Sequence, residues 1–143
     1  MALNFKKAAQ DAGVIQSGLL EGKTSTRLDQ ILMEPVTIIG VAPAVGKLEG
    51  RESRYPAIVV REYPNKFFKA GAGKVAQLIR AWADEAGCPF DPDADEAEFS
   101  CVHKNYDALT QELVEQGGVC VRFKMTHNDR TGRDYLDFDF VDD

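Results

Sequence analysis

Between Tyr55 and Lys69 the sequence brings cationic and aromatic side chains together at short spacing. The stretch contains Tyr55, Arg61, Tyr63, Lys66, Phe67, Phe68 and Lys69. Lysine and arginine neutralise phosphates, whereas a flat ring offers an unpaired base a stacking surface that contributes about 1–3 kcal/mol. These residue types therefore predict a surface that combines phosphate contacts with base stacking.

Two further groups of cations flank this stretch in the sequence. The polar, glycine-bounded segment 46–54, expected to be a loop, carries Lys47, Arg51 and Arg54. The expected loop between the last two strands, with its tip at 129–132, carries His127, Arg130 and Arg133. In an OB-fold, the loops between strands one and two and between strands four and five flank a binding face on strands two and three. The two groups are therefore expected to border the same face.

Phe67 and Phe68 are adjacent in a short predicted strand, 66–69. Successive side chains of a strand point to opposite faces of the sheet. We therefore expect at least one of the two rings to point away from the core, beside Lys66 and Lys69. A competing interpretation is that the rings straddle core and surface and that the charges form an ordinary solvated face.

The elements that position these residues follow from the hydrophobic pattern. Alternating, β-branched segments predict strands at 36–42, 55–63, 66–69, 119–125 and 135–141, and Gly40 indicates a bulge in the first. Helical spacing predicts helices over 74–86 and 106–116, and Thr26 with Asp29 resembles a capping box of a short helix. Five short strands with one helix between the third and fourth give the fold class: mainly β, an OB-fold-like five-stranded barrel with helices.

The length of 143 residues fits one domain. We expect a loosely ordered leader over 1–24 and a single OB-fold-like domain over 25–143 with an acidic insertion at about 88–104. No apolar run approaches the roughly 20 residues of a membrane helix. The three cysteines and the absence of a secretory signal pattern predict a cytoplasmic protein.

The net charge of −6 is unevenly distributed along the chain. Residues 1–83 contain 12 Lys or Arg against 7 Asp or Glu, residues 84–118 contain one against 10, and residues 119–143 contain 4 against 6. The local field governs the binding of a charged ligand. The acidic total therefore leaves a basic N-terminal half that is compatible with a polyanionic partner.

The sequence resembles the single-stranded DNA-binding proteins of phages and prophages that have an OB-fold. The resemblance rests on the residues 26–32 and 35–38, on the run Ile58-Val59-Val60-Arg61-Glu62-Tyr63-Pro64-Asn65-Lys66-Phe67-Phe68, and on the glycine pair followed by 74–82. It covers roughly half the chain. It implies binding of single-stranded DNA without sequence specificity, in phage DNA replication or recombination. Tyr55, Arg61, Tyr63, Lys66, Phe67, Phe68 and Lys69 would then contact the strand, with replication or recombination proteins as further partners.

Other chemistries are less well supported by the residues. Cys88, Cys101, His103 and Cys120 could supply four zinc ligands, but no C-x2-C pair is present. Asp137 and Asp139 could serve a metal-dependent nuclease, but no Glu-x-Lys motif accompanies them. We therefore expect no cofactor and no enzymatic activity. The alternative function is an OB-like adaptor that binds a protein partner through its acidic insertion; the preference for DNA or RNA and the formation of a homo-oligomer stay open.

Overall fold

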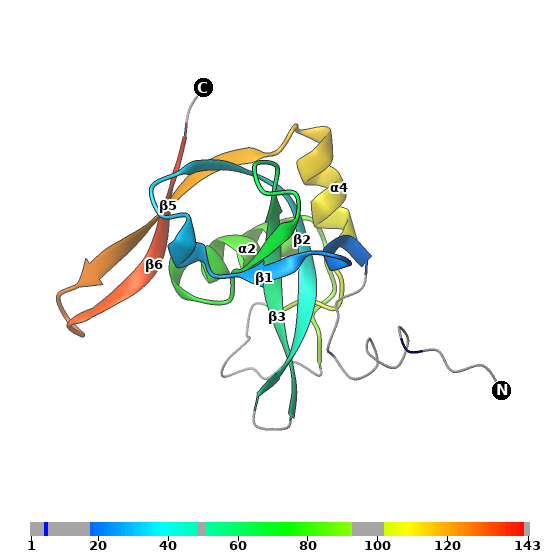
Figure 1. Cartoon of the computed structure of the whole chain (residues 1–143), viewed down its shortest axis with the longest axis horizontal. Helices are drawn as coiled ribbons and strands as arrows, with labels where there is room; N and C mark the ends of the chain where they lie inside the picture. Colours follow the sequence, from blue (N-terminus) through cyan, green and yellow to red (C-terminus); the bar gives the residue numbers. More distant parts are fainter. Residues whose placement is uncertain (1–4, 6–17, 49–50, 93–101, 142–143) are drawn as a thin grey trace.

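A computed structural model describes residues 5, 18–48, 51–92 and 102–141, without the side chains of 46–48 and 51–53. Two short 3-10 turns, two α-helices and six strands make up this part of the chain (Figure 1). In chain order they are η1 Gly18–Leu20, β1 Thr24–Thr26, η2 Leu28–Gln30, β2 Pro35–Leu48, β3 Arg51–Val60, β4 Lys66–Lys69, α2 Gly73–Glu85, α4 Asp107–Glu115, β5 Val119–Asn128 and β6 Arg133–Phe140.

The six strands form one mixed sheet in the order β1-β4-β3-β2-β5-β6. β1 pairs with β4 in parallel, and the other pairs are antiparallel. The mainly β class with helices is therefore confirmed. The sheet is open, with β1 and β6 at its edges among the described residues. Neither described helix has the length and apolar composition that a membrane span requires.

The hairpin of β2 and β3 extends further than its sequence pattern predicts. Pairing runs from Ile38 and Val60 out to Leu48 and Arg51, with a register shift between Ile38 and Gly40. The bulge predicted at Gly40 is confirmed. The prediction of a loop over 46–54 is wrong for 46–48 and 51–54, because their backbones continue the two-strand ladder.

Both faces of the sheet are covered, so the molecule has two apolar clusters. The larger one packs α2 and α4 against the sheet and includes Val36, Ile58, Val60 and Phe68. The smaller cluster lies among the alternate residues of the same strands and consists of Leu20, Ala44, Tyr55, Ala57, Val59 and Phe67. Leu20 of η1 is only 1% exposed. Residues from the predicted leader therefore help to cover the second cluster.

The helices begin and end close to their predicted positions. In α2 the stripe Val75, Ile79 and Ala83 is buried, and Gly87 follows with φ of 75°. In α4 Leu109 and Leu113 are buried, as the spacing predicts. The prediction of a capping box at Thr26 is wrong, because Thr26 belongs to β1. The turn η2 begins after Arg27, without a side-chain cap.

The expected acidic insertion is described only at its two flanks. Phe90 and His103 form an isolated antiparallel bridge, and the N–H of Lys104 donates to the carbonyl of Pro89 at 2.7 Å. The flanks therefore lie side by side, and residues 93–101 lie outside the described part. At the C-terminal end, the strand expected over 135–141 is confirmed as β6.

Candidate nucleic-acid interface

The two phenylalanines of β4 are both buried, on opposite faces of the sheet. Phe67 is 2% exposed in the smaller cluster, and Phe68 is 0% exposed in the larger one. The prediction that one ring points outward is wrong because the sheet is covered on both sides. Neither ring offers a surface to a base in this structure.

Lys69 lies over a tyrosine of the neighbouring strand. Its Nζ is 4.9 Å from the ring centroid of Tyr55. Lys69 is exposed, whereas Tyr55 is 8% exposed and packs in the smaller cluster. Burial raises the pKa of Tyr55 above its ordinary value, against the lowering effect of its hydrogen bond with Ser25. The ring therefore stays neutral at physiological pH, and the ammonium group of Lys69 lies over its face.

Lys66 has a similar arrangement at the other end of β4. Its Nζ is 5.6 Å from the ring centroid of Tyr63, whose hydroxyl donates a hydrogen bond to Glu34. This hydrogen bond is the main cause that raises the pKa of Tyr63. The ring also contacts Phe68 edge-on at 5.9 Å. Tyr63 is half-buried, so part of its ring faces water beside an exposed lysine.

A third lysine–tyrosine pair links α2 with β6. The Nζ of Lys74 is 5.7 Å from the ring centroid of Tyr135. Both residues line a hollow of about 370 Å³ between the start of α2 and the β5–β6 hairpin, together with Gly73, Gln77, Asn128, Thr131, Arg133 and Asp134. A Cβ on Gly73 would lie 2.3 Å from the carbonyl oxygen of Leu136, so only glycine permits this approach. The sequence did not predict the pair of Lys74 and Tyr135, because α2 and β6 are far apart along the chain.

The predicted arginines differ in how their charges are compensated. Arg54 forms an ion pair at 3.1 Å with Asp91, which is 1% exposed. Arg61 is exposed and donates to the carbonyl of Gly117 at 2.7 Å. Arg130 and Arg133 are exposed on the hairpin. Arg54 is therefore engaged in holding the hairpin of β2 and β3 against the segment after α2, whereas the others present charge to solvent.

The backbone segments that carry the two groups of flanking cations lie in different parts of the molecule. The described ends of β2 and β3 and the tip of the β5–β6 hairpin lie on different sides of the molecule (Figure 1). Lys47 and Arg51 have backbones in β2 and β3, and their side chains lie outside the described part. His127 contacts Asp134 at 2.9 Å and Asp129 at 3.7 Å, within its own hairpin. Of the cations from 66 to 74, Lys74 lies beside the β5–β6 hairpin, where it lines the same hollow as Arg133.

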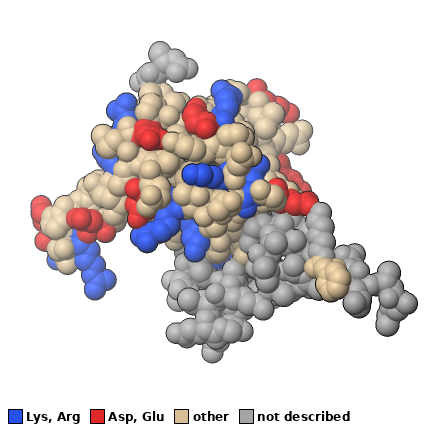
Figure 2. Space-filling model, viewed as in Figure 1, with Lys and Arg blue, Asp and Glu red and all other residues tan. Residues whose placement is uncertain are grey.

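Figure 2 shows how the charges are distributed on the face that β1 crosses. Lysine and arginine side chains are spread over its middle, and acidic side chains lie between them. The surface is therefore mixed in sign rather than uniformly basic. A polyanion would contact separate cations here, each supported by its own local partners.

The carboxylates of β6 have partners of their own. Asp137 accepts hydrogen bonds from the Thr126 hydroxyl and the Phe138 N–H, both at 2.8 Å. Burial alone would raise the pKa of Asp137, but these donors, with Lys74 and Lys124 nearby, hold it below its ordinary value. Asp139 pairs with Lys124 at 3.0 Å. Both carboxylates therefore act as parts of the strand pairing.

The potential zinc ligands are not assembled in the described part of the chain. The buried His103 has its Nδ1 3.0 Å from the carbonyl of Cys88 and its Nε2 3.5 Å from Asp84. Cys120 is half-buried on β5, and Cys101 lies outside the described residues. Within the described ranges, no three His, Cys, Asp or Glu side chains converge as metal ligands.

No family model matches the sequence, and no curated protein or solved structure is significantly similar to the chain. The resemblance to phage single-stranded DNA-binding proteins therefore stays a prediction from the residues that carry it.

Proposed function

We propose that this chain binds single-stranded DNA through the cations from Lys66 to Lys74 and the adjoining β5–β6 hairpin. The observation that carries the proposal is the set of three lysines, each exposed and each over a tyrosine ring: Lys66 with Tyr63, Lys69 with Tyr55, and Lys74 with Tyr135. Within nine residues, this arrangement supplies three cations that can each contact a phosphate.

The aromatic part of the interaction differs from the one expected from the sequence. Because Phe67 and Phe68 are buried, the half-buried rings of Tyr63 and Tyr135 are the candidates for stacking. Each carries a lysine beside it, so one side of the ring can meet a base while the cation meets the adjoining phosphate. Arg130 and Arg133 would extend the phosphate contacts along the hairpin.

The strand order supports an OB-like plan for this site. Without β1, the order is β4-β3-β2-β5-β6, with α2 between β4 and β5 in the sequence. This is the order expected of a five-stranded OB arrangement that is open between its third and fifth strands. β1 pairs with the outer edge of β4. In a closed barrel, the fifth strand would pair with this edge. The role in phage-type replication or recombination rests on the sequence resemblance alone.

The described residues bear differently on the two other functions. An adaptor that used the acidic insertion would act mainly through residues 93–101, outside the described part of the chain. A nuclease that used Asp137 and Asp139 would first have to release both from Thr126 and Lys124.

Fluorescence anisotropy with labelled dT20 tests the proposed function. Binding is expected at low salt and should weaken with a slope of about −0.7 in log K per log salt for each phosphate contact. Labelled single-stranded RNA of the same length shows whether the sugar matters. An absence of binding to dT20 at 20 mM salt would refute the proposal.

A further inference from the structure

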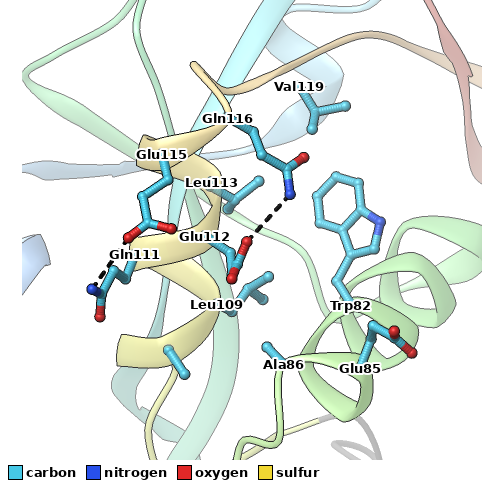
Figure 3. A pocket seen from close by; sticks show the side chains of 11 residues that line it. Trp82, Glu85, Ala86, Leu109, Gln111, Glu112, Leu113, Glu115, Gln116 and Val119 are labelled. Carbon is cyan, nitrogen blue, oxygen red and sulfur yellow. Dashed lines mark hydrogen bonds between the residues drawn. The ribbon is translucent and has the colours of Figure 1, made fainter.

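A groove of about 580 Å³ lies between α2 and α4, away from the lysine–tyrosine pairs. Its lining is apolar at Trp82, Ala86, Ala108, Leu109, Leu113 and Val119, and polar at Glu85, Gln111, Glu112, Glu115 and Gln116. Figure 3 shows the indole of Trp82 extending from α2 toward Gln116 and Val119, across the space between the helices.

Trp82 forms the largest apolar part of this groove. It packs against the main cluster on one side and is half-buried, so the rest of the ring faces the groove. It is the one tryptophan of the sequence. A large, partly accessible aromatic ring in a groove is typical of the sites that hold the anchoring side chain of a protein partner.

The margins of the groove carry a single sign of charge. Glu85, Glu112 and Glu115 line it, and among the described residues that line it there is no Lys, Arg or His. Glu112 accepts from the Gln116 amide at 3.3 Å, and Glu115 accepts from the Gln111 amide at 3.4 Å (Figure 3). An amide carries no net charge, so these bonds orient the carboxylates and leave their negative charge in place.

This charge decides among the classes of occupant. Phosphates would be repelled by three carboxylates. A second copy docked through the same face would bring carboxylates against carboxylates. An amphipathic helix with lysine or arginine beside its apolar stripe would place cations at the margins and an aliphatic or aromatic side chain on Trp82.

We propose that the groove between α2 and α4 binds a basic amphipathic helix of a protein partner. The apolar stripe of that helix packs on Trp82 and Ala86, and its cations face Glu112 and Glu115. The site is independent of the proposed nucleic-acid interface, because it shares none of the residues of that interface.

A direct test uses the emission of Trp82, since this residue reports on the groove itself. The probe is a tryptophan-free 16-residue peptide of leucine and lysine with helical spacing. Two matched peptides have serine for leucine, or glutamate for lysine. At 150 mM salt we expect the leucine–lysine peptide to shift the emission to shorter wavelength, and the serine–lysine peptide to bind at least about 10-fold more weakly. The glutamate peptide should not bind.

Matched variants of the full chain locate the site. Glu112→Lys should weaken binding of the leucine–lysine peptide at least about 5-fold, whereas Asp129→Lys, the same charge change at a 99% exposed carboxylate on the β5–β6 hairpin, should leave it within about twofold. Ala108→Lys adds a cation at the margin and should also weaken binding. Circular dichroism shows that each variant is folded.

Four results would overturn the proposal. The first is no binding of the leucine–lysine peptide up to 1 mM, and the second is equal binding of the serine–lysine peptide. The third is that Glu112→Lys and Asp129→Lys weaken binding of the leucine–lysine peptide equally. This would mean that the overall negative charge of the protein attracts the peptide. A concentration-dependent emission change without peptide, lost in Ala108→Lys, would assign the groove to a second copy instead. A chain that does not bind dT20 could still give any of these four results or none of them, so the two proposals fail separately.

Discussion

The hydroxyl of Thr110 on α4 forms two hydrogen bonds with the backbone of Val41 on β2. It accepts from the Val41 N–H at 3.0 Å and donates to the Val41 carbonyl at 2.9 Å. The pairing of β2 with β5 ends at Ile38, so within the described ranges no strand pairs with Val41 on that side. Thr110 therefore satisfies backbone groups that would otherwise lie buried and unpaired beneath the helix.

Thr110→Val should lower the free energy of unfolding by about 1–3 kcal/mol, because an isosteric methyl group leaves the Val41 donor and acceptor without a partner. Urea denaturation at pH 7 measures the change. Thr24→Val, at an exposed position of β1, is the matched control and should change stability by less than about 0.5 kcal/mol. Equal effects would mean that the Thr110 bonds contribute nothing specific.

Gly73→Ala should destabilise the protein far more than Gly87→Ala. Both glycines have positive φ, 61° and 75°, so both substitutions carry a backbone cost of about 1–2 kcal/mol. Only at Gly73 would the new Cβ also clash with Leu136, since nothing lies within 4 Å of the position at Gly87. Urea denaturation of the two variants compares them directly. A similar loss in both would show that α2 and β6 do not approach as described.

Asp137 should make stability depend on pH below its ordinary pKa. Its pKa is lower in the folded protein than the ordinary value of 3.8. The unfolded chain therefore takes up the proton first as the pH falls, and the stabilisation, fully present above 3.8, is lost as the pH drops through the folded value.

Urea denaturation of Asp137→Asn at pH 7 and at pH 2.5 measures this contribution. The variant should be less stable than the original protein at pH 7, and the difference should shrink at pH 2.5. A difference that is the same at both values would contradict a role for the ionised carboxylate. Asp129→Asn, at an exposed carboxylate, is the control for a general charge effect.

Phe67→Ala should act on folding rather than on binding. Removal of a ring that is 2% exposed costs about 3–5 kcal/mol of stability. Phe140→Ala, at a ring that is 56% exposed, should cost less than about 1 kcal/mol. If Phe67→Ala keeps its stability and loses dT20 binding, the ring reaches DNA after all, and the burial described above does not persist in the complex.

Lys66→Ala, Lys69→Ala and Lys74→Ala should each weaken dT20 binding by about 3–10-fold at low salt and reduce the salt slope by about 0.7. Lys124→Ala is the matched control, because that lysine is on the β5–β6 hairpin but is paired with Asp139 and is not one of the proposed phosphate contacts. Anisotropy titrations at 20 and 200 mM salt provide both quantities. An equal effect of Lys124→Ala would indicate binding to net charge only.

The hydrophobic pattern predicted the local elements well. The period of α2, the alternation of β5 and the short strand at 66–69 all depend on side chains a few residues apart, and these predictions are confirmed within a few residues. The strand Thr24–Thr26 was missed because three small polar residues carry no alternation. Its partner lies about 40 residues further along the chain.

The exposure of side chains was harder to predict than the positions of the strands. Alternation assigned Phe67 and Phe68 correctly to opposite faces, but it does not say which faces reach water. That depends on Leu20, which covers one side, and on α2 and α4, which cover the other. Likewise, no local pattern in the sequence connects Lys74 with Tyr135, because the closure of α2 against β6 through Gly73 is a tertiary contact.

The parallel pairing of β1 with β4 also has a consequence for synthesis on the ribosome. The chain emerges N-terminus first, so Thr24–Thr26 leaves the ribosome well before Lys66–Lys69 exists as a partner. The β2–β3 hairpin, whose strands are adjacent in the sequence, can form from nearer contacts. β1, the first described strand, can therefore join the sheet only after β4 has been made. Until then, the outer edge of the nascent sheet stays available for pairing with other chains.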